Sequence, residues 1–171
     1  REDIIDKVGE QYKINNRYSF EFYEDDENPV YLEGTGSMII DRPNHIVYAC
    51  LSERTDATLL DKFNVLMGTK SIVFRSLDKE GHEIYHTNVM MALGEDFVVI
   101  CMESIPDEES KKRLNKSFSD TGKEVIEISQ KQTESFAGNM LEVKGRDNRR
   151  YLCMSETAYN SLTLSQKEKL S

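Results

Sequence analysis

The chain repeats itself at an interval of about 51 residues, and this repeat constrains its fold more than any other feature. Cys50, Cys101 and Cys153 lie 51 and 52 residues apart, and a leucine or a methionine follows each of them. Each cysteine lies in the second of two short apolar stretches that are joined by a turn, which is the pattern of a β-hairpin. A repeat of this length indicates a modular architecture in which each module is one supersecondary unit.

The first two copies predict the same order of elements, which is strand, strand, helix and strand. For the first copy we expect strands over 37–40 and 46–51, a helix from a cap at Thr55 or Asp56 to a stop at Gly68, and a strand over 71–75. For the second copy we expect strands over 88–93 and 97–102, a helix from Pro106 to about Asp120, and a strand over 125–128. A third hairpin is expected over 140–143 and 151–154, and the N-terminal part predicts a helix over 2–12 and a strand around Phe20 and Phe22.

These elements predict an α/β fold of ββαβ modules arranged as a ring or propeller that is incomplete in this segment. The expected modules cover residues 33–78 and 84–129, with the end of another module in 1–24 and the start of a further one in 136–171. A ring brings the same end of every module toward a common axis. Polar residues that recur at that end are therefore expected to converge.

Composition excludes several classes of protein. The 171 residues suit one domain or part of one, and 31 acidic against 22 basic side chains give a net charge of −9. Such a charge argues against nucleic acids and anionic membranes as partners, and no apolar run reaches the roughly 18 residues of a spanning helix. The odd number of cysteines, with no CxxC pair, fits a reducing cytoplasm. The chain opens without an apolar targeting segment and without methionine, so we expect an excised segment.

The cysteines are predicted to be structural. Their number is odd, none forms a CxxC pair, and the chain has only three histidines, so neither a disulfide framework nor a metal site is expected. A thiol repeated at one position of a buried strand behaves as a small apolar core residue. We therefore expect Cys50, Cys101 and Cys153 to lie in the core.

The candidate functional residues lie just before the first strand of each module. Glu33 follows an apolar stretch and precedes Gly34-Thr35-Gly36, where a backbone can approach a ligand closely. His86 and Asn88 occupy the corresponding place in the second module, and Asn139 occupies it in the third. The residues alone leave simpler interpretations open: a solvated turn glutamate, a hydrogen-bonded structural histidine, and a turn asparagine. The remaining histidines, His45 and His82, lie in polar turns and are expected at the surface.

Three strings carry a resemblance to a known superfamily. They are Leu32-Glu33-Gly34-Thr35-Gly36-Ser37, Ile84-Tyr85-His86-Thr87-Asn88-Val89-Met90-Met91 and Ser135-Phe136-Ala137-Gly138-Asn139-Met140-Leu141. Together they resemble the guanidino-group modifying superfamily of amidinotransferases and arginine deiminases, and most closely the bacterial deiminase-related hydrolases that include citrulline ureidases. The resemblance implies the pentein fold, with five ββαβ modules around a pseudo-fivefold axis and the active site in the central channel.

The resemblance also implies a chemistry. In this superfamily a cysteine attacks the guanidino or ureido carbon of an arginine-like substrate, a histidine moves protons, and an acidic residue holds the planar nitrogen group. On this basis His86 and Glu33 are the expected catalytic residues, and Asn88 and Asn139 are expected to bind substrate. Many deiminases have an acidic residue where this chain has Asn88, and an amide suits a neutral ureido group as well as a guanidinium.

The cysteine nucleophile is expected outside these 171 residues, because the family places it near the C-terminus in a Gly-rich segment that this chain does not match. The segment alone is therefore expected to be inactive. No cofactor is expected, the partner is a small guanidino or ureido amino acid, and a homo-oligomer is possible. The alternatives are a non-catalytic pentein that binds a partner, like the ribosome anti-association factors of this fold, and an unrelated regulatory α/β domain.

Overall fold

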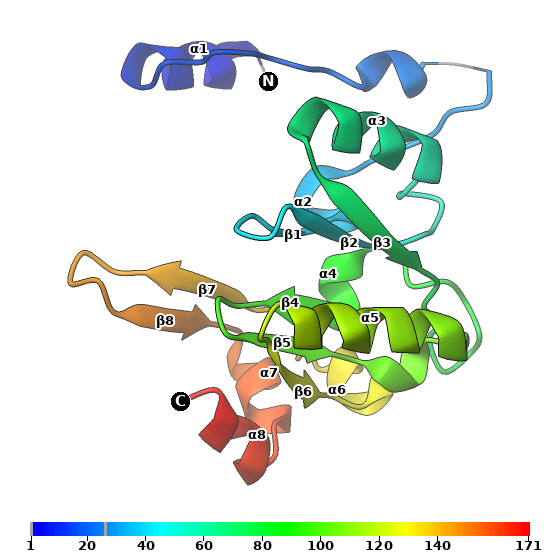
Figure 1. Cartoon of the computed structure of the whole chain (residues 1–171), viewed down its shortest axis with the longest axis vertical. Coiled ribbons are helices and arrows are strands. Elements are labelled where there is room, and N and C mark those ends of the chain that lie inside the picture. The colour runs from blue at the N-terminus through cyan, green and yellow to red at the C-terminus, as the bar shows by residue number, and fades with distance from the viewer. Residues whose placement is uncertain (1, 26) are drawn as a thin grey trace.

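Two three-stranded sheets repeat one strand order along the chain (Figure 1). The computed structural model describes residues 2–25 and 27–171, so Arg1 and Asp26 lie outside it. In each sheet the middle strand pairs antiparallel with the strand before it and parallel with the strand after it. The first sheet contains β1 (Ile39–Asp41), β2 (Ile46–Cys50) and β3 (Lys70–Phe74), and the second contains β4 (Met91–Leu93), β5 (Phe97–Ile100) and β6 (Glu124–Glu127).

One long helix joins the last two strands of each sheet, which confirms the predicted ββαβ order in two successive units. We call them the first unit (β1, β2, α3, β3) and the second unit (β4, β5, α5, β6). The helices are α3 (Ala57–Met67) and α5 (Glu108–Asp120). The Asp56 side chain accepts a hydrogen bond from the Leu59 amide and so caps α3, which ends at Gly68 with φ 64°. Both ends of α3 lie where the sequence predicts them.

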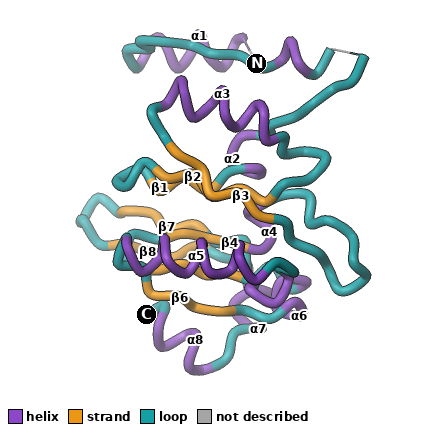
Figure 2. Tube along the Cα trace, turned by 45° about the vertical axis from the view of Figure 1, so that its right-hand side comes forward, coloured by secondary structure: helices purple, strands orange, loops and turns teal. Residues whose placement is uncertain are grey.

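A third hairpin follows, formed by β7 (Leu141–Lys144) and β8 (Arg150–Cys153). The remaining C-terminal helices are α6 (Gln130–Glu134), α7 (Glu156–Ser161) and α8 (Leu164–Lys169), and a short 3-10 turn, η2 (Met102–Ser104), follows β5. The first strands of successive units lie side by side, β1 against β4 and β4 against β7. Figure 2 shows the first sheet above the second, with α3 above the first sheet and α8 below the second.

Each unit opens with a single helical turn that the sequence did not predict. These turns are α2 (Gly34–Ser37) and α4 (Thr87–Met90), so Ser37 and Asn88 are helical and the expectation that they begin strands is wrong. In α2 the Ser37 hydroxyl accepts a hydrogen bond from the Glu33 amide, 2.9 Å away. A serine that bonds to a nearby backbone group competes with a strand ladder, which explains the helical turn here.

The N-terminal part confirms one prediction and contradicts another. Helix α1 (Glu2–Gln11) lies where a helix was expected. Instead of a strand around Phe20 and Phe22, the chain forms a 3-10 turn, η1 (Glu21–Tyr23). The backbone bonds there are local, from Tyr23 to Phe20 and from Glu24 to Glu21, and Phe22 is 77% exposed. Alternating apolar residues form a strand only where a partner strand is available, and here none pairs with them among the described residues.

The core runs from the first sheet through the second. Tyr48 of β2 and Phe118 of α5 are both fully buried and their tilted rings pack together with centroids 5.2 Å apart. The Tyr48 hydroxyl lies in hydrogen-bond contact with that of Ser117 at 2.8 Å. Cys50 and Cys101 are buried as predicted. Cys153 is exposed, so its predicted place in the core is wrong. Among the described residues β8 pairs with β7 alone, so its sheet has two strands where those of the other two cysteines have three.

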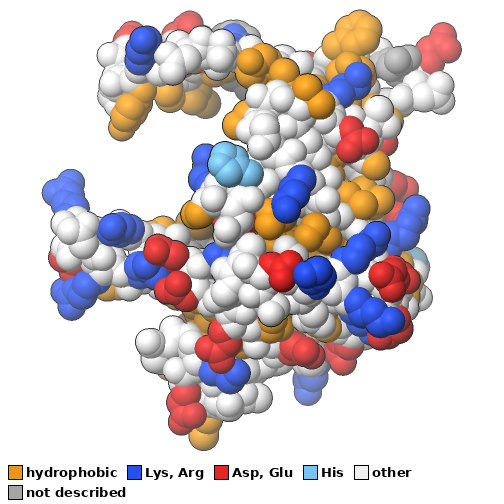
Figure 3. Space-filling model, viewed as in Figure 1, with side chains coloured by type: hydrophobic (Ala, Val, Ile, Leu, Met, Phe, Trp, Pro, Cys, Tyr) orange, Lys and Arg blue, Asp and Glu red, His pale blue; other side chains and the backbone are white. Residues whose placement is uncertain are grey.

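In the described part of the chain, no helix has both the length and the apolar character that a membrane span requires. On the face seen in Figure 3, acidic and basic side chains are interspersed over the lower half of the molecule.

Candidate functional site

Glu33 and His86 meet across the boundary between the two units. Each residue immediately precedes the single helical turn that opens its unit, Glu33 before α2 and His86 before α4. The imidazole Nε2 of His86 lies 2.6 Å from Oε2 of Glu33. The histidine side chain is 17% exposed and the glutamate side chain 37% exposed. The two residues that the sequence singled out as catalytic candidates are therefore in hydrogen-bond contact and accessible from solvent.

Gly36 makes this contact possible. A Cβ atom at position 36 would lie 2.7 Å from Cε1 and 2.8 Å from Nδ1 of His86, closer than non-bonded atoms approach. The imidazole ring therefore packs directly on the backbone of α2. A side chain at position 36 would push the ring away from Glu33.

Arg54 and Tyr85 complete the surroundings of the pair. Arg54 Nη1 lies 3.7 Å from the same Oε2 atom of Glu33, and its guanidinium lies over the Tyr85 ring, 5.1 Å from the centroid. The Tyr85 ring in turn lies 4.9 Å from the His86 ring. The sequence reasoning missed Arg54, because an arginine in a polar loop between a strand and a helix cap carries no local signal of function.

Asn88 and Asn139 also come together, and they line a cavity that Glu33 does not line. The Asn139 side-chain amide donates to the Asn88 carbonyl at 3.2 Å. Both residues line a cavity of about 430 Å³ with Thr35, whereas Glu33 lines a different cavity of about 500 Å³ beside Tyr18, Phe20 and Tyr31. The structure therefore does not place the two asparagines in one cavity with Glu33.

None of the three thiols in the described chain is hydrogen-bonded to Glu33 or His86. The Cys50 Sγ lies 3.6 Å from the carbonyl oxygen of Ile84, and burial raises the pKa of this thiol to about 12. Such a thiol stays protonated near neutral pH and is a poor nucleophile. Over residues 2–25 and 27–171 there is also no group of three or more histidine, cysteine or acidic side chains suited to hold a metal ion.

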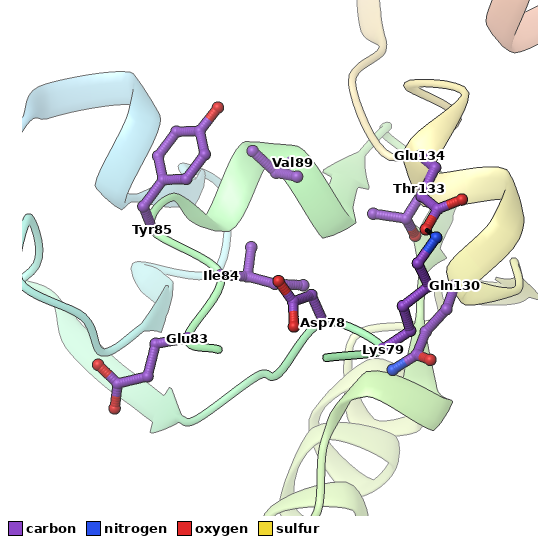
Figure 4. A pocket seen from close by; sticks show the side chains of 9 residues that line it. All are labelled: Asp78, Lys79, Glu83, Ile84, Tyr85, Val89, Gln130, Thr133 and Glu134. Atoms are coloured by element: carbon purple, nitrogen blue, oxygen red, sulfur yellow. Dashed lines mark ion pairs between the residues drawn. The ribbon is translucent and has the colours of Figure 1, made fainter. Parts of the chain in front are cut away.

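A third cavity, of about 210 Å³, lies between the loop before α4 and helix α6 (Figure 4). Its charged side chains already have partners. Glu134 pairs with Lys79 at 2.5 Å, Glu83 pairs with Arg75, and Asp78 accepts from the His82 amide at 2.8 Å. Its charged side chains are already bonded within the protein, and neither Glu33 nor His86 lies in its wall, so this cavity is a weaker candidate than the Glu33–His86 pair.

Solved structures of similar fold come from an arginine-processing enzyme. The N-terminal domain of ArgZ, an arginine dihydrolase from the ornithine–ammonia cycle in cyanobacteria, matches in its product-bound form with 19% identity and a TM-score of 0.63 over 84% of this chain. A substrate-bound mutant of that domain matches with 18% identity and a TM-score of 0.62 over 81% of this chain. A further mutant, covalently bound to a reaction intermediate, matches with 15% identity and a TM-score of 0.56 over 81% of this chain.

These matches establish a shared α/β fold of the pentein type. The chain spans less than half of the ArgZ domain, 46% in the first two structures and 47% in the third. Among curated proteins none matches the chain significantly.

The sequence itself matches one family along its whole length. The family is described as N,N dimethylarginine dimethylhydrolase, eukaryotic, and the match covers residues 1–171. The resemblance to the guanidino-group modifying superfamily is thereby confirmed, with a branch named for dimethylarginine rather than for citrulline. An unrelated regulatory α/β domain is excluded. With both the fold and the full length of the sequence in agreement, the chain belongs to the eukaryotic N,N-dimethylarginine dimethylhydrolase family of that superfamily.

Proposed function

We propose that this chain supplies the Glu–His half of a site that hydrolyses the C–N bonds of a guanidino or ureido group on an arginine-like amino acid. Glu33 and His86 are the proposed catalytic residues, and the nucleophilic cysteine is proposed to lie outside these 171 residues. The observation that carries the proposal is the 2.6 Å contact between His86 Nε2 and Glu33 Oε2 at the unit boundary. Family membership and the ArgZ fold support it.

The geometry suits a proton-transfer role for His86. A carboxylate can only accept, so Nε2 donates to Glu33 and the lone pair of the neutral ring lies on Nδ1. That nitrogen can take a proton from the attacking thiol. It can then return the proton to the leaving nitrogen as the C–N bond breaks.

The second half of the reaction uses the same histidine. The covalent C–S adduct is attacked by water, His86 removes a proton from that water, and the C–S bond breaks to regenerate the thiol. One water is consumed for each C–N bond broken. A covalent intermediate is recorded for ArgZ, and in our proposal this chain shares that route.

Glu33 and Arg54 provide charges for binding the substrate. Among the described residues, the polar contacts of the Glu33 carboxylate are made to Oε2, and we propose that Oε1 accepts an N–H of the planar substrate group. A carboxylate that accepts from a planar nitrogen group gives a charge-assisted bond with defined orientation. Arg54, half-exposed beside this group, is proposed to pair with the substrate carboxylate. Asn88 and Asn139 are proposed to contact a more distant part of the substrate, because they line a separate cavity.

The test is turnover by the full-length protein with three substrates: arginine, N,N-dimethylarginine and citrulline. We expect at least one to be hydrolysed, and His86→Ala to lower kcat by about 10²–10⁴-fold because general acid–base assistance is lost. Glu33→Gln keeps the shape but removes the charge, and should lower kcat/KM by about 10–100-fold.

Melting temperatures provide the control. Both side chains are partly exposed, so both variants should melt within a few degrees of wild type. If the full-length protein hydrolyses none of the three substrates, the enzymatic proposal fails, and a non-catalytic binding role takes its place. If His86→Ala lowers the melting temperature clearly while turnover per folded molecule is unchanged, His86 is structural.

A further inference from the structure

A hydroxyl group from the second unit completes the hydrogen-bond ladder of the first hairpin. In that hairpin Ile39 stands opposite Tyr48, so the same register places Ser37 opposite Cys50. The Cys50 amide donates to Oγ1 of Thr87 at 2.8 Å, and this hydroxyl donates to the Ser37 carbonyl at 2.5 Å. Thr87 thus bridges the two backbone groups that face each other where the ladder ends.

In the second hairpin, the two backbone groups at the equivalent position bond to each other directly, without a bridging hydroxyl. There Met91 stands opposite Ile100, so Met90 faces Cys101. The Cys101 amide donates directly to the Met90 carbonyl at 3.0 Å. Because Ser37 and Met90 each end the helical turn that opens a unit, the two positions are equivalent. The hydroxyl bridge is therefore a feature of the first unit and not a requirement of the repeat.

The bridge connects both members of the candidate site. Thr87 directly follows His86, and it is fully buried. Ser37 is also fully buried; its hydroxyl accepts a hydrogen bond from the Glu33 amide at 2.9 Å and donates one to the Arg54 carbonyl at 2.7 Å. The backbones that carry Glu33, Arg54 and His86 are thus joined through two buried hydroxyl groups.

We propose that Thr87 is a positioning residue that sets the separation of Glu33 and His86, an inference that rests on the proposed hydrolase function. The hydroxyl fixes the start of α4 against the end of α2, and so fixes the place from which the imidazole reaches the carboxylate. Without it two facing backbone groups lose their partner, and unsatisfied buried groups drive a local shift of the two turns. A displacement of about 1 Å at a catalytic pair can cost about 10²-fold in rate.

The experiment compares Thr87→Val, which keeps the side-chain shape and loses the hydroxyl, with Thr87→Ser, which keeps the hydroxyl. In the full-length protein we expect Thr87→Val to lower kcat by about 10–100-fold with KM within about twofold of wild type. Thr87→Ser should restore most of kcat. A folded Thr87→Val protein with unchanged kcat, or one in which only KM rises, overturns the proposal.

A matched control removes another buried hydroxyl pair. Ser76 and Ser104 are both buried and bond to each other at 2.6 Å. Ser76→Ala should lower the melting temperature and leave kcat unchanged. If Ser76→Ala lowers kcat as much as Thr87→Val does, the effect is general destabilisation and Thr87 has no positioning role.

Two further measurements test the positioning role even if the proposed hydrolase function fails or the Thr87→Val variant does not fold. The Nε2 proton of His86, held against Glu33, should give a resolved NMR signal in wild type and Thr87→Ser that is lost in Thr87→Val. This arm decides the positioning role even if wild type hydrolyses none of the substrates and the proposed function fails. If Thr87→Val does not fold, Thr87→Cys, with its weak S–H donor, replaces it. Its kcat should lie below that of Thr87→Ser, and equal values overturn the proposal.

Discussion

Gly36 controls how closely the His86 imidazole can approach Glu33. The backbone of Gly36 does not require glycine by its φ angle, so the Gly36→Ala change acts through the clash of the new Cβ with three ring atoms at 2.7–2.9 Å. We expect Gly36→Ala to separate His86 from Glu33 and to lower kcat by about tenfold or more while the protein remains folded. Steady-state kinetics and a melting curve of the full-length protein measure the two effects.

Gly68 serves as the control for this prediction, because it needs glycine for its backbone conformation and not for space. Gly68 ends α3 with φ 64° and has no neighbouring atom within 4 Å of the position a Cβ would take. Gly68→Ala should cost about 1 kcal/mol of stability through backbone strain and leave kcat per folded molecule unchanged. Equal kcat losses in the two variants would contradict a steric role for Gly36.

The Cys50 thiol predicts a pH dependence of stability. Burial raises its pKa from 9.0 to about 12, so the folded chain holds this proton more tightly than the unfolded chain does. The resulting stabilisation is complete below about pH 9 and is lost as the pH rises from 9 toward 12. We expect the difference in unfolding free energy between wild type and Cys50→Ala to decrease over that range, measured by urea denaturation under reducing conditions. A difference that stays constant from pH 8 to 10.5 would show that Cys50 ionises freely in the folded chain.

At the residue scale, sequence reasoning identified side chains whose type is unusual for their place. Glu33 and His86 stand between apolar stretches and glycines or threonine, and the structure brings them into contact. Thr87 and Arg54 could not be assigned a role in this way. Their roles depend on contacts with residues that are distant in the sequence, such as those of Thr87 with Cys50 and Ser37. Cys153 was misplaced because its strand pattern matches the buried copies while its surroundings do not.

The long helices have ends fixed by side chains that the sequence makes visible. Asp56 accepts from the Leu59 amide at 3.0 Å and satisfies one of the free donors at the start of α3. We expect Asp56→Ala to lower the unfolding free energy by about 1 kcal/mol, and Asp56→Asn or Asp56→Ser to retain most of it, since all three caps accept such a bond. Chemical denaturation of the three variants measures this order, and an Asp56→Ala variant as stable as wild type would refute the capping role.

At the element scale, the sequence predicted what local pattern determines. Hairpins with strong turn signals, and helices with a cap and a glycine stop, lie close to their expected bounds. The single turns α2 and α4 were not predicted, because four residues are too few for a periodic pattern and their geometry depends on contacts between the two turns. The strand expected around Phe20 and Phe22 was predicted but did not form, because an alternating pattern without a partner strand remains a turn.

The two units are joined by a buried ion pair. Asp41, at the end of β1, and Lys123, just before β6, have side chains that are 1% and 5% exposed, with Nζ 3.6 Å from Oδ2. Asn44 also donates to Asp41 at 2.9 Å, and Lys123 donates to the Glu95 carbonyl at 2.5 Å. Charges buried in this way stabilise a structure only while both partners are present.

We therefore expect Asp41→Asn to destabilise the protein by about 3 kcal/mol or more, because Lys123 keeps its buried charge without its partner. Adding Lys123→Met should recover a large part of that loss. The check is a double-mutant cycle of unfolding free energies, in which the double variant loses less than the sum of the single variants. Additive losses would show that the two charges do not interact.

At the scale of the whole molecule, the repeat in the sequence predicted the order of elements within each unit but not the contacts between the units. The order of elements in each unit follows from local pattern, and family membership agrees with it. The Asp41–Lys123 pair lies between residues 82 positions apart, and neither has a neighbour in the sequence that reveals its burial. The closed ring of modules and the module boundaries stay predictions, since the chain spans less than half of the ArgZ domain.

Glu33 and His86 occupy one and the same position in two copies of a unit, the residue before its opening helical turn. A gene duplication that produces two adjacent copies of a unit therefore brings two copies of this position face to face without any new backbone design. Divergence of the two copies then needs only a carboxylate in one and an imidazole in the other. Two identical units would present two glutamates or two histidines at this position, so the Glu–His pair requires two units of different sequence.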